Sequence, residues 1–139
     1  MRSWLLPCVL SAAFAAIPAR ADDEAKRPEH KITQSKSFIM VEPFYTTFYD
    51  AGRPAGLLMV AVGLDVPNDA LRSDVDRGMP RLRDDYLRNL SLFAATAVRP
   101  DRQPDVNEIA GRLQRVTDRA LHRPGAKVLL AQVAIRVSR

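Results

Sequence analysis

The stretch Met79–Leu90, MPRLRDDYLRNL, has the apolar spacing of an amphipathic helix but carries Pro80 near its front. A proline inside a helix removes one backbone hydrogen bond and clashes with the preceding turn, at a cost of about 3 kcal/mol. The apolar stripe nevertheless keeps one phase on both sides of the proline, through Leu71, Val75, Met79, Leu82, Tyr86, Leu90 and Phe93. We therefore expect one bent helix that opens near Asn68, a favourable N-cap residue, and packs along a sheet, with Gly78 and Pro80 as the cause of the bend.

A second helix is expected to begin at Asp105. Glu108 follows three residues later, which is an aspartate version of the capping box. The apolar spacing continues through Ile109, Leu113, Val116 and Ala120. The sequence HRPG at 122–125 then combines basic residues, proline and glycine, all of which favour a helix end.

Three stretches have the composition of strands: Ser37–Tyr49, Leu57–Val66 and Lys127–Val137. The second is apolar on both alternating sets, so we expect it at the centre of the sheet. Pro43 predicts that the first strand lies at an edge or contains a bulge. The connector Asp50–Gly56, DAGRPAG, has the glycine and proline content of a hairpin loop.

The third strand is expected to present one apolar face, with Gln132 and Arg136 on the opposite side. That apolar face would consist of Leu129, Ala131, Val133, Ile135 and Val137. The element order is strand, strand, helix, helix, strand, which predicts an α+β domain with both helices layered on one face of a small sheet.

The N-terminus has the pattern of an export signal. Arg2 precedes an apolar run from Trp4 to Ile17, and an Ala-x-Ala site predicts cleavage after Ala21. The run is shorter than the roughly 20 residues of a membrane-spanning helix, although an uncleaved inner-membrane anchor stays an alternative. We thus divide the chain into a signal peptide at 1–21, a charged disordered tether at 22–37 and one domain at 38–139, which is enough chain for a single core.

The charge of the chain gives little support to nucleic-acid binding. The formal net charge is +5, and cleavage after Ala21 would lower it by two, because Arg2 and Arg20 would be lost. Such a mild excess fits an exported protein with a mixed-charge surface, while an anionic lipid surface or an acidic partner stays open.

The residues of catalytic and metal sites are scarce. The sequence after Ala21 has no cysteine, and its two histidines, His30 and His122, have no second ligand at zinc spacing. No nucleophile elbow, metalloprotease motif or glycine-rich phosphate loop occurs. We therefore expect a non-enzymatic module with no cofactor and no metal; a hydrolase would have to use His122 as its base.

Charged residues line the side of the first helix opposite its apolar stripe. Asp84 with Arg88, and Arg81 with Asp85, have the spacing of ion pairs along a helix. Two interpretations stay open. Either this is a solvated helix face, or Arg77, Arg81 and Arg88 form a docking strip for another protein.

The proline helix and its neighbours resemble the periplasmic domain of the FliL family. The resemblance rests on MPRLRDDYLRNLS, on the preceding VGLDVPND and on the terminal VLLAQVAIRVS. Its most specific element is the pattern of Pro80, Arg83 and Asp84, flanked by Met79 and Leu87. The similarity covers residues 38–139.

The resemblance implies an SPFH-like domain, similar to those of stomatin and prohibitin, that oligomerises beside membranes. FliL proteins are thought to form rings around the ion-driven stator of the flagellar motor, and no catalysis or cofactor belongs to that family. The resemblance thus implies a periplasmic, motility-supporting protein that contacts stator or basal-body proteins and other copies of itself. This chain departs from the family at its cleavable N-terminus, because FliL is ordinarily held by an N-terminal membrane helix. A cleaved domain would have peripheral membrane contact or none.

A different class of function also fits the residues. The aromatic-rich strand Phe38–Tyr49 would supply the contact surface of a periplasmic module that binds a small ligand or an envelope component. Its aromatic side chains would otherwise belong to the core.

Overall fold

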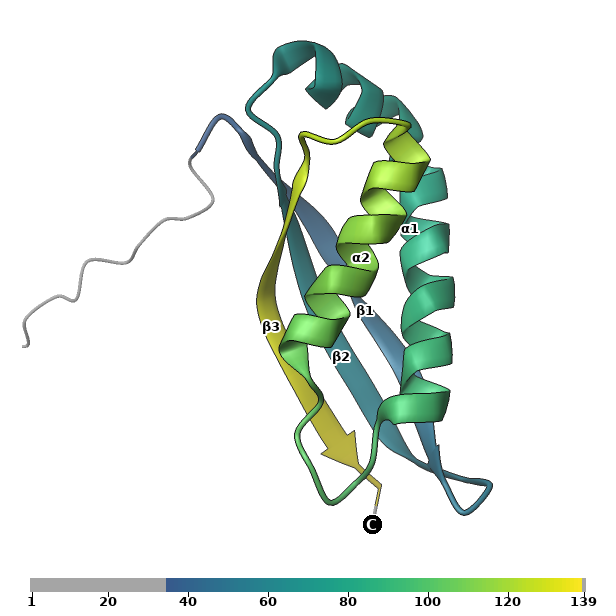
Figure 1. Ribbon diagram of the computed structural model, residues 1–139. Helices are drawn as coiled ribbons and strands as arrows, with labels where there is room; N and C mark the ends of the chain where they lie inside the picture. Colours follow the sequence, from purple (N-terminus) through teal and green to yellow (C-terminus); the bar gives the residue numbers. More distant parts are fainter. Residues whose placement is uncertain (1–34, 139) are drawn as a thin grey trace, which may run out of the picture. The chain divides into compact units, whose positions relative to one another are not determined.

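The computed structural model describes residues 35–138, so the predicted signal peptide and most of the predicted tether lie outside the described residues. The element order is β1 (Phe38–Asp50), β2 (Arg53–Asp65), α1 (Asp69–Ala97), α2 (Val106–Leu121) and β3 (Lys127–Val137). Both helices lie on the same side of the sheet (Figure 1). The expected α+β fold with β-β-α-α-β order is confirmed.

The sheet is antiparallel, in the order β1-β2-β3, so the strand that is apolar on both sides is central as predicted. Its first edge strand is β1, and the register shifts between Val41 and Phe44. Glu42 and Pro43 lie in this shift, opposite a single residue of β2. Both expectations from Pro43, the edge position and the bulge, are therefore confirmed.

The hairpin between β1 and β2 is tighter than its glycine and proline content indicated. The strands are joined by Ala51 and Gly52 alone, with φ angles of 47° and 78°. Two consecutive residues of positive φ match the right-handed twist of the flanking strands. The expected loop over Asp50–Gly56 is thus wrong in extent, because Arg53, Pro54 and Gly56 already pair with β1.

The prediction for the apolar face of β3 is wrong in its first half. Gln132 pairs with Ala61 and Leu130 pairs with Val62, which leaves Ala131 as an extra residue in a bulge. The bulge changes the alternation, so the inward-facing residues are Val128, Leu130, Val133 and Ile135. Leu129, expected on that face, does not lie on it, because one extra residue reverses the alternation, and Ala131 is itself the unpaired bulge residue.

Helix α1 runs through Pro80 without a break over its 29 residues. Asn68 is the N-cap, and its side chain accepts a hydrogen bond from the backbone N–H of Leu71 at 2.9 Å. The ribbon changes direction after its first turns (Figure 1). The expected stripe is buried except at Met79, which is only partly buried. The single bent helix is therefore confirmed.

Helix α2 begins and ends at its predicted signals. The Asp105 carboxylate accepts hydrogen bonds from the backbone N–H groups of Asn107 and Glu108, at 2.9 and 3.1 Å. His122 closes the helix in the left-handed conformation, with a φ angle of 55°. The Glu108 side chain pairs with Arg112 rather than completing the capping box.

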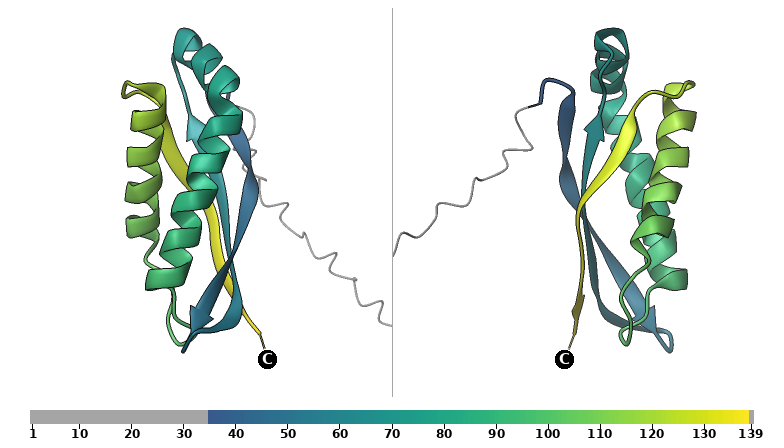
Figure 2. Two further views of the ribbon diagram at one scale, coloured as in Figure 1. Left: turned by 90° about the vertical axis from the view of Figure 1, so that its right-hand side faces the viewer. Right: turned by 60° about the vertical axis from the view of Figure 1, so that its left-hand side comes forward.

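The core lies between the sheet and the two helices. Leu58, Val60, Val62 and Leu64 of β2 are at most 2% exposed, and they face the buried stripes of α1 and α2. From the side, the two helices form one layer and the sheet the other (Figure 2). Among residues 35–138, the helices therefore cover only one face of the sheet.

Candidate interaction surfaces

The uncovered side of the sheet, which we call the outer sheet face, is defined by the strand register. Alternate residues of a strand point to opposite sides, and cross-strand partners share a side. Since Leu58 and its alternates face the core, the other set forms the outer sheet face: Phe38, Met40, Tyr45, Thr47, Leu57, Met59, Ala61, Gly63, Asp65, Lys127, Leu129, Gln132, Ala134 and Arg136. Large apolar side chains there reach solvent, with Met40 exposed to 65%, Tyr45 to 60% and Leu57 to 42%.

One end of this face is closely packed. A Cβ atom at Gly63 would come within 2.3 Å of the Phe38 ring, so the ring lies directly against the glycine backbone. An aromatic ring over a strand glycine covers backbone that would otherwise be open to water. A side chain at Gly63 would displace Phe38 from the outer sheet face.

The three arginines proposed as a docking strip lie on α1 and are exposed. Spacings of four and seven residues place Arg77, Arg81 and Arg88 on one side of a helix, away from the buried stripe. Arg88 pairs with Asp84 at 2.6 Å, as expected. Arg81 and Asp85 both line a shallow groove against α2, but no ion pair joins them among the described residues.

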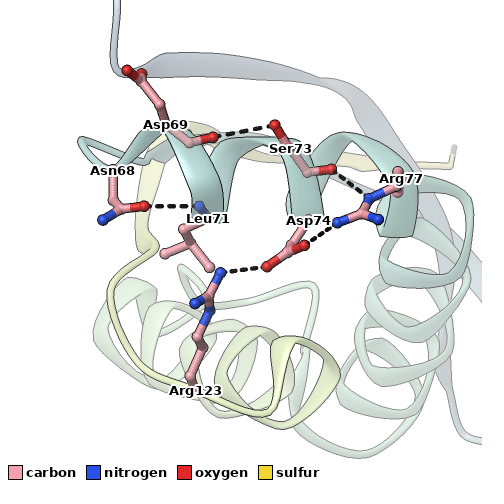
Figure 3. A network of polar contacts seen from close by, with 7 residues as sticks. All are labelled: Asn68, Asp69, Leu71, Ser73, Asp74, Arg77 and Arg123. Carbon is pink, nitrogen blue, oxygen red and sulfur yellow. Dashed lines mark hydrogen bonds and ion pairs between the residues drawn. The ribbon is translucent and has the colours of Figure 1, made fainter.

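Arg77 has a role that its sequence position does not reveal. The two carboxylate oxygens of Asp74 bind different arginines, Arg77 on the same helix and Arg123 in the loop after α2 (Figure 3). Arg77 also donates to the Ser73 carbonyl at 3.3 Å. Asp74 therefore joins the first turns of α1 to the end of α2.

A second contact joins the same part of α1 to the start of the domain. Arg72 donates to the backbone carbonyl of Lys36 at 2.5 Å, and Val66 N–H donates to the Ser37 carbonyl at 2.7 Å. Lys36 and Ser37 fall at the end of the predicted tether. The front of α1 thus contacts both the start of the domain and the loop after α2, which holds the bent segment in place.

Arg83, part of the most specific pattern in the resemblance, contacts another element. Its guanidinium pairs with the carboxylate of Glu42 at 2.5 Å, and Glu42 lies in the β1 bulge beside Pro43. Both side chains are substantially exposed, so the pair contributes little stability. It links the exposed side of α1 to the bulged edge of the sheet.

The buried polar groups of the core lie beneath α2. Tyr86 hydroxyl and Thr117 Oγ1 are 2.5 Å apart, and Thr117 donates to the Leu113 carbonyl at 2.8 Å. Burial raises the pKa of Tyr86 to about 12, with the nearby charge of Asp118 acting in the same direction and the Thr117 hydrogen bond opposing it.

Two grooves flank α2. One lies between α2 and β3, has a volume of about 390 Å³ and is lined by Val106, Asn107, Ala110, Leu130, Ala131, Gln132 and Val133. The other, of about 200 Å³, holds His122 and Arg119 opposite Arg81 and Asp85. No hydroxyl or thiol side chain lines this second groove, so it offers His122 no nucleophile among the described residues.

Within residues 35–138, no three histidine, cysteine or carboxylate side chains gather as metal ligands would. The helices of the same part of the chain are not long and apolar enough to cross a membrane. No protein-family model matches this chain, and a comparison with curated proteins gave no match either.

Proposed function

We propose that this protein is a non-enzymatic accessory of the flagellar basal body, which acts in the periplasm by contact with stator or other motor proteins, as FliL-like domains do. The observation that supports the proposal most is helix α1. It continues through Pro80, and the residues of the FliL-like pattern lie at its surface, with Arg83 against the β1 bulge and Asp84 paired with Arg88.

The exposed side of α1 supplies the candidate contact surface. Arg77 and Arg88 each have a carboxylate partner within the domain, whereas Arg81 has no ion pair among the described residues. An arginine without an internal partner loses less on docking to an acidic surface, since no existing pair has to be broken. Arg81 is therefore the arginine of this strip that we expect to matter most.

The proposal is tested by deleting the gene and measuring swimming in soft agar while flagella are counted by electron microscopy. We expect fewer or slower swimmers with normal filament numbers, and normal swimming would contradict the role in motility. Complementation with Arg81→Glu should fail to restore swimming. Arg115→Glu is the matched control, because Arg115 is an exposed arginine on α2. Equal rescue by both variants would remove the α1 strip from the proposal.

A small-ligand module is the second candidate, and the groove between α2 and β3 is the observation in its favour. Its volume of about 390 Å³ lies within the usual range of ligand sites, and Asn107 and Gln132 supply polar groups. This groove is not formed by the aromatic strand: Phe44 and Phe48 are in the core, and Tyr45 and Tyr49 lie exposed. A small molecule retained in native mass spectrometry and lost in Ala110→Trp would favour this candidate.

A further inference from the structure

We propose that the outer sheet face is the contact surface for a second copy of this chain, which stacks sheet against sheet about a twofold axis. The inference concerns a surface that the α1 docking strip does not use, and it does not depend on the proposed function. It rests on the composition of this face, its size and the condition of the sheet edges.

The centre of the outer sheet face carries no charge. The register forms rows across the strands, and the rows Met40–Gly63–Leu129 and Tyr45–Met59–Ala134 are entirely uncharged. Asp65 and Lys127 lie in the row at one end, and Arg136 lies in a row at the other. An uncharged centre between charged ends is the distribution of an interface core with a polar rim.

The face is large enough for a stable contact. Met40, Tyr45 and Leu57, exposed to 65%, 60% and 42%, together offer about 330 Å² of accessible surface at about 200 Å² for each large side chain. That is already a large apolar patch for a monomer. A standard interface buries about 800 Å² on each partner, and the remaining residues of the face are available to supply the rest.

Both sheet edges are unsuited to pairing with another strand. On β1, the bulge and Pro43 interrupt the edge. On β3, Gln114 of α2 already binds the edge, because its side-chain oxygen accepts from Val128 N–H at 2.9 Å and its amide donates to the Ala126 carbonyl at 2.9 Å. Further along β3, the Ala131 bulge breaks the ladder. We therefore expect another molecule to associate with the face of the sheet rather than with one of its edge strands.

A second copy is the occupant that this geometry favours. A twofold contact needs only that one patch be complementary to itself, and two apolar sheet faces stack at about 10 Å in a recurring arrangement. No central charge of one copy would meet a like charge of the other. The grooves flanking α2 lie on the helix side of the domain and at the β3 edge. They therefore do not indicate a small-molecule site at the centre of the outer sheet face.

The first test compares two leucines of equal exposure on opposite sides of the domain. Leu57 on the outer sheet face is 42% exposed, and Leu87 on α1 is 43% exposed. Sedimentation of the full chain over a wide concentration range should show a dimer. Leu57→Lys should weaken self-association by at least about tenfold, because it replaces an apolar contact with a second positive charge beside Arg136, and Leu87→Lys should leave it unchanged. Circular dichroism checks that both variants are folded.

The second test stays informative if Leu57→Lys fails to fold. In a Cys8→Ser background, which removes the native cysteine, Ala61→Cys places a thiol in the middle row of the outer sheet face. Oxidation should cross-link this variant to itself, while Leu87→Cys stays uncross-linked. A wild-type monomer at every concentration, or a dimer dissociated by Leu87→Lys and not by Leu57→Lys, would overturn the proposal. So would a monomer that binds anionic vesicles through Leu57, which would identify the face as a membrane-binding surface.

Discussion

The two faces of the sheet are built from the same three strands but differ in what covers them. Val60 and its inward neighbours are almost completely buried beneath α1 and α2, whereas Tyr45 is 60% exposed on the other side. Both faces are largely apolar, so hydrophobicity by itself does not explain which one the helices cover. Among the described residues, the helices bury one apolar face and leave the large side chains of the other exposed.

The largest expected effect is on the unfolding free energy, which should respond differently to substitutions on the two faces of the sheet. Leu82 is 1% exposed in the covered core. Replacing it with alanine should lower the unfolding free energy by about 2–5 kcal/mol, because the change leaves a cavity. Leu57→Ala on the outer sheet face should change the unfolding free energy of the dilute monomer by less than about 0.5 kcal/mol. Urea denaturation measures both values. Equal losses would mean that the outer face is as tightly packed as the inner one.

The covered face should also respond to alkaline pH. A tyrosine in an unfolded chain ionises near pH 10, and burial raises the pKa of Tyr86 to about 12. Its stabilising contribution is therefore complete below pH 10 and is lost as the pH rises towards 12. The loss should reach about 3 kcal/mol, measured by urea denaturation across this pH range. Tyr86→Phe is the control and should lose correspondingly less stability over the same range; an identical pH dependence would contradict a raised pKa.

Thr117 tests the polar contact beneath α2. Thr117→Val keeps the shape of the side chain but leaves the Tyr86 hydroxyl without its 2.5 Å partner. A buried donor without an acceptor costs about 1–3 kcal/mol, so the thermal midpoint should fall. An unchanged midpoint would show that water reaches the Tyr86 hydroxyl.

The same substitution at Thr46, threonine to valine, should change the stability in the opposite direction. Thr46 is 5% exposed on the inner side of β1, and its hydroxyl has no hydrogen-bond partner within residues 35–138. Thr46→Val removes this unsatisfied group and should raise stability by about 1 kcal/mol, measured by urea denaturation. A loss of stability would mean that the hydroxyl has a partner in solution. Together the two threonines distinguish a satisfied from an unsatisfied buried hydroxyl.

The features that sequence reasoning predicted have local causes. Asn68 caps α1 because its side chain reaches a backbone N–H three residues away, and Pro43 lies in a bulge because proline has no N–H to donate. The stripe across Pro80 predicted one helix, since the apolar phase persists through the bend. Each of these signals acts within a few residues.

The features that sequence reasoning missed depend on distant partners. Glu42 was not identified, although its carboxylate pairs with Arg83 and links α1 to the bulged edge of the sheet. Its place beside Pro43 was the only signal for it. Arg77 was assigned to a docking strip. In the structure it forms an ion pair with Asp74, and the same carboxylate also pairs with Arg123. No residue near Ala131 indicated a bulge, so the prediction continued the alternation of inward and outward residues along the whole of β3.

By itself, the sequence determined the elements of this protein and their order, because capping, proline effects and apolar periodicity act between near neighbours. Only the tertiary structure decided which residues of β3 face the core, how the front of α1 is held, and which apolar sheet face α1 and α2 cover. These outcomes depend on register and on contacts between residues far apart in the chain. An apolar strand residue has the same pattern whether a helix of its own chain or a second molecule covers it.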